Sequence, residues 1–106
     1  MSKAKSAVEA AVQPFVITRS RLTGVLCGYL VRQTADEVVL RDARQIWRFA
    51  GVETCSGLAL KGASLTSRTR IDEPAPMVII KREEGMATFT CSPEAEANLI
   101  QSRWLD

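Results

Sequence analysis

Short apolar runs separated by polar turns fill the first half of the chain. Residues 15–18, 25–31 and 38–40 are rich in β-branched and large apolar side chains, which favour β-strands. The polar residues 33–37 indicate a turn, so the second and third runs predict an antiparallel hairpin. Gly28 lies inside the second run, where a glycine indicates a bulge or the close approach of another backbone.

The third run continues into the segment VVLRDARQIWRFAG, residues 38–51, in which arginines and large apolar side chains are mixed. Two local structures fit this segment. Asp42, with a glutamine three residues later, matches the capping box of a helix start. We prefer a strand through Phe49 with a kink near Asp42, because the Ile, Trp and Phe side chains suit a pleated surface. Arg44 and Arg48 are four residues apart, so they share a face in a helix and in a regular strand, and only a bulge would separate them.

A short helix is predicted within residues 55–62. It begins near Thr54 or Ser56, whose hydroxyl groups suit a helix start, and Gly62 ends it.

Three further strands are predicted after this helix. Residues 65–71 alternate between two faces, and one of these faces carries Arg68 and Arg70. Residues 77–80 and 86–91 are separated by a charged turn, and they predict a second hairpin.

A second helix is predicted at the C-terminal end. Ser92 is a suitable N-cap and Pro93 suits the first helical position. Ala95 and Leu99 fall on one stripe, which predicts the buried face of this helix. Trp104 follows this helix, and two roles are open for it. Its side chain either packs against the domain and fixes the helix, or covers a ligand or a neighbouring subunit as an aromatic lid.

Together these elements predict an α+β fold: a curved antiparallel sheet with one short helix and a C-terminal helix packed on it. The single domain spans residues 14–106, and residues 1–13 form a flexible or helical N-terminal arm. A domain of 106 residues has a small core, which leaves room for self-association, so we expect a homo-oligomer.

The chain carries no apolar run approaching the roughly 20 residues that cross a bilayer. Its start, MSKAKSAVEAAVQ, is too polar for a secretory signal. We therefore expect a cytoplasmic protein with no membrane partner.

The formal net charge of +2 conceals an uneven distribution. Residues 13–70 carry nine Lys or Arg against four Asp or Glu, whereas residues 71–106 carry three against seven. This pattern indicates either complementary halves, which meet within the fold or between subunits, or a basic face for a phosphorylated ligand. The net charge is too small to favour bulk DNA binding.

Several kinds of chemistry have no support in the sequence. The chain has no histidine, no glycine-rich phosphate loop, and three widely spaced cysteines without a CxxC pair. We expect free thiols, no metal, no cofactor and no catalytic residue, and hence a protein that is not an enzyme.

The arginine-rich segment admits two interpretations. In the first, Trp47 and Phe49 fill the core and the arginines lie in solvent or pair with the acidic half. In the second, Arg44 and Arg48 hold an anion while an aromatic ring stacks on the ligand, because guanidinium groups match the geometry of phosphate. The second interpretation predicts these ligand-binding residues: Arg41, Arg44, Trp47, Arg48, Arg68 and Arg70.

Four segments resemble a known family: EVVLRDARQIWRFAG at 37–51, CSGLALKG at 55–62, MVII at 77–80 and SPEAEANLIQSRW at 92–104. The family consists of small uncharacterised bacteriophage and prophage proteins that share an A-R-x-I-W-x-[WF]-x-G pattern. The resemblance implies a phage accessory protein without catalytic residues in the host cytoplasm, and such proteins frequently counter host defences.

The function expected on these grounds is non-enzymatic: binding a small anionic ligand, such as a nucleotide immune signal, to counter host defence by sequestration. Two alternatives stay open. One is a protein-interaction module that inhibits a host protein, and the other is a weak nucleic-acid binder, whose affinity would fall steeply with salt.

Overall fold

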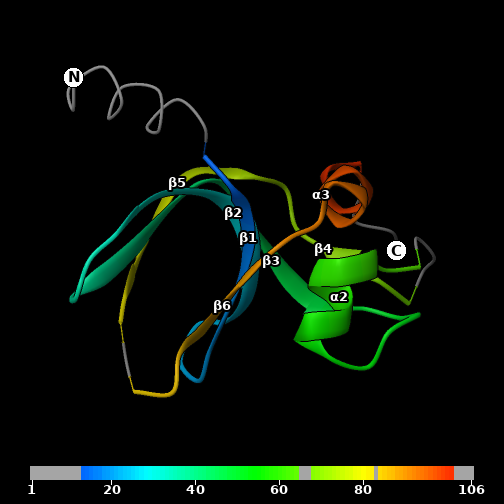
Figure 1. The fold of residues 1–106 in the computed structure, drawn as a ribbon, viewed down its shortest axis with the longest axis horizontal. Helices are drawn as coiled ribbons and strands as arrows, with labels where there is room; N and C mark the ends of the chain where they lie inside the picture. The colour runs from blue at the N-terminus through cyan, green and yellow to red at the C-terminus, as the bar shows by residue number, and fades with distance from the viewer. Residues whose placement is uncertain (1–12, 65–67, 83, 102–106) are drawn as a thin grey trace.

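The computed structural model describes residues 13–64, 68–82 and 84–101 as one sheet with two helices (Figure 1). The arm predicted over residues 1–13 and the alternatives for Trp104 therefore lie almost wholly outside the described residues. The α+β fold class is confirmed, with both helices at one end of the sheet (Figure 1). The elements in chain order are β1 (Phe15–Ser20), β2 (Gly24–Gln33), β3 (Glu37–Arg48), α2 (Cys55–Lys61), β4 (Arg70–Ile71), β5 (Ala75–Lys81), β6 (Ala87–Thr90) and α3 (Pro93–Ile100).

The strands pair in the order β4-β3-β2-β1-β6, and β5 also pairs with β3. All the pairs are antiparallel. The first half of β3, from Glu37 to Ala43, pairs with β5, and its second half, Ile46 to Arg48, pairs with β4. β4 and β5 therefore follow one another along the same side of β3, and the predicted hairpin of β2 and β3 is confirmed.

The second predicted hairpin is wrong. β5 pairs with β3 at one side of the sheet, whereas β6 pairs with β1 at the other. The pairing of β6 with β1 places Phe89 opposite Ile17, and both side chains pack in the core under the helices. Burial of Phe89 there outweighs the short sequence separation that would favour a local hairpin.

A bulge confirms the kinked strand predicted for β3. Cys27 pairs with Arg44 and Tyr29 with Arg41, so two residues of β3 face the single residue Gly28 of β2. The first of the two, Asp42, has a φ of 51°. A Cβ on Gly28 would lie 3.0 Å from the Ala43 Cα and 3.1 Å from the Arg41 carbonyl oxygen, so this glycine permits a close backbone approach, as predicted.

Gly28→Ala is expected to lower the free energy of unfolding by about 1–3 kcal/mol, the usual effect of overpacking against groups that cannot move aside. Urea denaturation measures this change. Gln33→Ala, at an exposed position of the same strand, is the control and should change stability by less than about 0.5 kcal/mol. Equal stability of the Gly28 variant and the unmodified chain would show that the strands can separate at the bulge.

Two cores lie on the two faces of the sheet. The helix-side core lies between the sheet and the two helices, and it includes the following buried residues: Phe15, Ile17, Cys27, Ile46, Leu58, Ile71 and Leu99. The second core lies on the opposite face, and its buried residues are Val16, Leu26, Val38, Leu40, Ala43 and Ile80. Strand residues on both faces are therefore buried, which agrees with the continuous apolar runs of the sequence.

Both helices begin as predicted, and α2 also ends as predicted. Thr54 caps α2 by accepting a hydrogen bond from the Gly57 N–H, and Gly62 follows its last turn. Ser92 caps α3 by accepting from the Ala95 N–H, and Pro93 is the first helical residue. The described residues contain no helix of the length and apolarity needed to cross a membrane.

Of the strand predicted over residues 65–71, the structure describes residues 68–71 and confirms the last two. Residues 65–67 lie outside the described part of the chain, and β4 comprises Arg70 and Ile71 alone. Arg68 lies in the turn that precedes β4. Arg68 and Arg70 therefore do not share one face of a regular strand.

Candidate functional site

Arg44 lies inside the molecule, with 6% of its surface exposed. Its Nε donates to the Asp72 carbonyl at 2.6 Å, and its two terminal nitrogens donate to the carbonyls of Leu99 at 2.9 Å, Ile100 at 3.3 Å and Ile71 at 3.4 Å. The last carbonyls of a helix lack partners within the helix and carry its partial negative charge, so a guanidinium group stabilises them.

These contacts correct the prediction that Arg44 holds a ligand. Its guanidinium group joins β3 to the end of β4 and to the C-terminal end of α3. It is not accessible to an external anion, and the candidate surface does not include it.

A second irregularity in β3 separates Arg48 from Arg44. Ile46 pairs with Ile71 and Arg48 with Arg70, so Trp47 is an extra residue on β3 at this point. Ile71 and Arg70 are consecutive, and their side chains point to opposite faces of the sheet. Arg48 and Arg70 therefore lie together on the face opposite the helices, and the shared face predicted for Arg44 and Arg48 is wrong because a bulge intervenes.

Trp47 is exposed over 64% of its surface. Its Nε1 donates to Oδ2 of Asp72 at 3.3 Å, which orients the indole ring. Phe49, by contrast, is partly buried and packs against the helix-side core. Of the two aromatic residues in the segment, Phe49 supports the core and Trp47 is accessible to a ligand.

Three arginines at this end of the sheet, Arg48, Arg68 and Arg70, make up what we call the β3–β4 arginine cluster. Arg48 and Arg68 are exposed and Arg70 is half-buried. Arg48 and Arg70 are direct partners across two strands, and like charges in such a pair repel one another. An anion bound between them would offset that repulsion.

Arg41 lies at the other end of β3, away from this cluster. Its guanidinium carbon is 4.4 Å from the centre of the Tyr29 ring, its Nε donates to Gln13 at 2.9 Å, and its NH1 pairs with Asp42 at 2.6 Å. These contacts hold Arg41 over an aromatic ring of the protein itself. Of the six predicted residues, the structure thus brings Arg48 and Arg70 into direct opposition, with Trp47 next to Arg48 in the chain.

A family model described as a domain of unknown function, DUF6948, matches residues 13–99. The chain belongs to the DUF6948 family. No curated protein and no solved structure matches it. The matched range contains every described strand, so the family assignment covers the sheet that carries the candidate residues.

A hollow of about 470 Å³ lies on the helix-free face of the DUF6948 domain. Leu22, Leu26 and Val78 contribute apolar surface, and the acidic residues Asp72 and Glu73 also line it. Asp72 is in addition the residue to which the Trp47 indole donates, so the hollow adjoins the tryptophan. The sequence does not reveal this hollow, because its residues come from three separate segments of the chain, 22–26, 43–45 and 72–80.

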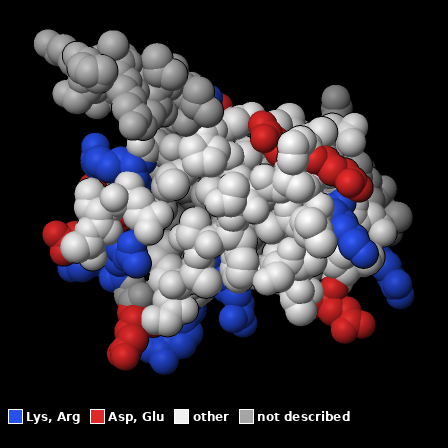
Figure 2. Space-filling view, viewed as in Figure 1, with Lys and Arg blue, Asp and Glu red and all other residues white. Residues whose placement is uncertain are grey.

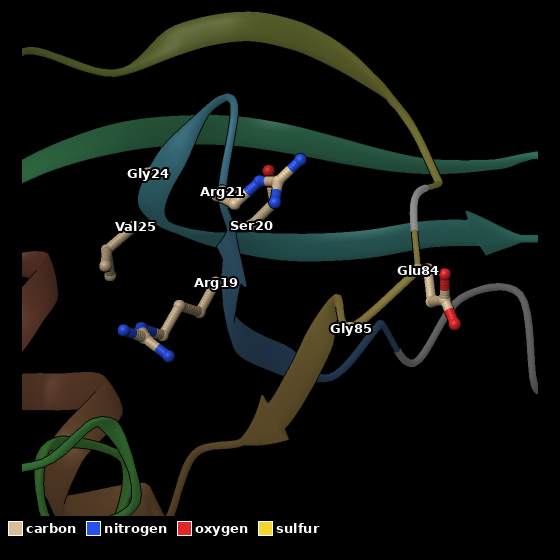
Figure 3. A pocket seen from close by; sticks show the side chains of 7 residues that line it. All are labelled: Arg19, Ser20, Arg21, Gly24, Val25, Glu84 and Gly85. Atoms are coloured by element: carbon tan, nitrogen blue, oxygen red, sulfur yellow. The ribbon is translucent and has the colours of Figure 1, made fainter.

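Figure 3 shows another hollow, of about 550 Å³, at the turn between β1 and β2. The side chains of Arg19 and Arg21, which line it, extend away from one another, and Glu84 lies to one side (Figure 3). The guanidinium groups of Arg19 and Arg21 are therefore not directed at one point, and this hollow does not present a two-arginine anion site.

The cysteines of the DUF6948 domain are free thiols in the structure. Burial raises the pKa of Cys27 to about 12, and burial together with the Glu96 carboxylate raises the pKa of Cys91 to about 12. Both groups are protonated at neutral pH, the form in which a thiol is a poor nucleophile. Within residues 13–64, 68–82 and 84–101, no three His, Cys, Asp or Glu side chains gather as a metal site requires.

Figure 2 shows one face of the molecule, on which charges of both signs lie around the periphery and the centre is uncharged. A protein that binds nucleic acid through its backbone usually presents a continuous basic surface. On this face the DUF6948 domain presents none.

Proposed function

We propose that this DUF6948 domain is a non-enzymatic binding protein for a small anionic ligand of the nucleotide class. The observation that carries the proposal is the direct opposition of Arg48 and Arg70 on the helix-free face, which also carries an apolar hollow next to Trp47. An anionic group and an aromatic ring in one ligand match this combination of cations, tryptophan and hollow.

The phosphate of such a ligand binds at the β3–β4 arginine cluster. Guanidinium groups donate two parallel hydrogen bonds to phosphate oxygens, and two of them in register accommodate one phosphate group from both sides. The charge of the phosphate also removes the repulsion between Arg48 and Arg70.

The base of the ligand stacks on Trp47 and extends into the hollow. Asp72 and Glu73 offer carboxylate oxygens, which accept hydrogen bonds from the amino groups of a base. Asp72 already accepts from the Trp47 indole, which fixes the ring beside the hollow before the ligand arrives.

The absence of histidine from the whole sequence supports binding without catalysis, since histidine is the usual proton carrier near neutral pH. The raised pKa values of Cys27 and Cys91 support the same view, because neither thiol is activated as a nucleophile. Sequestration of a nucleotide signal requires tight binding and no turnover. The proposal therefore includes the role that the phage resemblance implies, which is to counter host defence in the host cytoplasm by removing such a signal.

A second candidate function is inhibition of a host protein. The exposed Trp47 favours it, because tryptophan is enriched among the residues that dominate the energy of protein interfaces. A stoichiometric protein partner, retained from a bacterial lysate after nucleotides are removed and lost with Trp47→Ala, would favour this candidate.

Titration calorimetry with linear and cyclic nucleotides tests the nucleotide proposal. Arg48→Ala and Arg70→Ala are each expected to weaken binding by about 1.5–3 kcal/mol, or at least tenfold, since each removes a charge-assisted hydrogen bond. Trp47→Ala is expected to weaken binding by about 1–3 kcal/mol through loss of stacking on the base.

The matched control for this experiment is Arg32→Ala. Arg32 is an exposed arginine that pairs with Glu37 at 2.9 Å, at the opposite end of β3 from the cluster. Its removal should leave nucleotide affinity unchanged. Heat of binding that is absent for every nucleotide, or that the Arg32 and Arg48 variants reduce equally, would reject the proposal.

A further inference from the structure

β5 is an edge strand that is long and uncharged over most of its length. In the described part of the chain it pairs with β3 on one side, and no strand covers the other side. The six residues from Ala75 to Ile80 carry no charge. Proteins usually block such edges with charged residues or short strands, and a bare edge pairs readily with another chain.

Two large apolar side chains on β5 are exposed on the same face. Met77 is 53% exposed and Ile79 is 62% exposed, and as alternate residues of a strand they point the same way. Val78 and Ile80 point to the opposite face, where they pack in the second core. Within one molecule, more than half of the surface of each of these two apolar side chains is therefore left in solvent.

The backbone groups on the open side of β5 belong to the same alternate residues. The Arg82 N–H donates to the Asp36 carbonyl at 2.9 Å, so it points toward β3. Backbone groups alternate in direction along a strand, so those of Ile80, Val78 and Pro76 also point toward β3. The groups of Ala75, Met77, Ile79 and Lys81 point outward and are available to another strand.

We propose that two copies of this chain form a dimer by antiparallel pairing of β5 with β5 across a twofold axis at Val78. This register pairs Met77 with Ile79 of the partner subunit and Ala75 with Lys81 of the partner subunit. It uses all four outward-facing residues of each strand, which a register centred elsewhere does not. The exposed Met77 and Ile79 of both copies then form one apolar cluster, as expected of a self-complementary twofold interface.

Charge complementarity selects a second copy as the occupant. Lys81 and Arg82 lie at one end of β5, whereas Asp72 and Glu73 precede the other end. Antiparallel pairing brings the basic end of each strand to the acidic end of the other. Lys81 then lies diagonal to the partner's Glu73, within reach of long side chains.

Sedimentation velocity over a range of concentrations tests the dimer. The unmodified chain is expected to be dimeric, and Ile79→Lys is expected to weaken the dimer at least tenfold, because it places a charge within the apolar cluster. Leu60→Lys is the matched control, since Leu60 on α2 is 60% exposed and should leave the dimer unchanged. A chain that stays monomeric at all concentrations, or a dimer that Ile79→Lys does not weaken, overturns the proposal.

A charge swap and hydrogen exchange test the register. Glu73→Lys alone should weaken the dimer, and Glu73→Lys combined with Lys81→Glu should restore it. The amides of Met77, Ile79 and Lys81 should exchange more slowly as the protein concentration rises, while that of Val78 should not change. Concentration-dependent protection of the β6 amides instead would assign the dimer to the other edge of the sheet and overturn the β5 pairing.

Discussion

Arg44→Met is expected to lower the free energy of unfolding by about 3–5 kcal/mol, a large effect for one side chain. The substitution retains much of the apolar volume but removes every hydrogen bond that the guanidinium group donates. The carbonyls of Ile71, Asp72, Leu99 and Ile100 then lose the guanidinium donor, and a buried carbonyl left unsatisfied costs about 1–3 kcal/mol. Urea denaturation measures the loss.

Two control variants distinguish the loss of the Arg44 hydrogen bonds from the loss of a positive charge alone. Arg48→Met removes an exposed guanidinium group from the same strand and should change stability by less than about 0.5 kcal/mol. Arg44→Lys keeps the charge but lacks the planar fork that reaches several carbonyls, so it should also be destabilising. Hydrogen exchange in α3 should accelerate in both Arg44 variants, because the C-terminal end of that helix loses its anchor. An Arg44→Met variant as stable as the unmodified chain would contradict this account.

Gly62→Ala is expected to lower the free energy of unfolding by about 3 kcal/mol or more, because it combines backbone strain with a steric clash. Gly62 has a φ of 81° and a ψ of −170°, a region of the backbone map that glycine alone adopts without strain. A Cβ there would lie 2.5 Å from the Asn98 Cγ. Asn98 cannot move aside freely, since its side chain accepts from the Ala63 N–H and donates to the Ala63 carbonyl, both at 2.9 Å.

Gly85→Ala is the matched control for this prediction. Gly85 has a φ of 86°, but a Cβ there meets nothing within 4 Å, so the variant shows backbone strain alone, about 1–2 kcal/mol. The difference between the two variants, measured by urea denaturation, gives the contribution of the contact between α2 and α3. Equal effects of the two substitutions would show that Asn98 moves aside without loss.

The sequence predicts the local elements of this fold well. The hairpin of β2 and β3, the kinked strand through Asp42, and the caps at Thr54 and Ser92 all follow from short-range rules. These features depend on residues close in sequence, whose backbone preferences and hydrogen bonds are visible in the chain itself. The pairing of β6 with β1 was missed because it depends on where Phe89 is buried, a property of the whole sheet.

The burial of Arg44 and the separation of Arg48 from it were harder to predict. The spacing of Arg44 and Arg48 implies a shared face only if β3 is regular between them, and the extra residue Trp47 removes that condition. One signal was available: Arg44 and Ile46 alternate on one face of the strand, which indicates that the arginine shares the buried face of the isoleucine. The sequence does not show that Arg44 contacts the C-terminal carbonyls of α3, where Leu99 lies 55 residues further along the chain. These carbonyls make burial of the Arg44 charge favourable.

The pairing of the first strand with the last has a consequence for synthesis on the ribosome. β1 comprises residues 15–20 and β6 comprises residues 87–90, so the whole segment between them must be translated before the outer side of β1 acquires its neighbour. Until then the nascent protein exposes an unpaired hydrogen-bonding edge, which is the kind of surface that aggregates. We expect the closing of β6 onto β1 to be a late step of folding, and ribosome-bound chains that end before residue 87 to depend on chaperones for solubility.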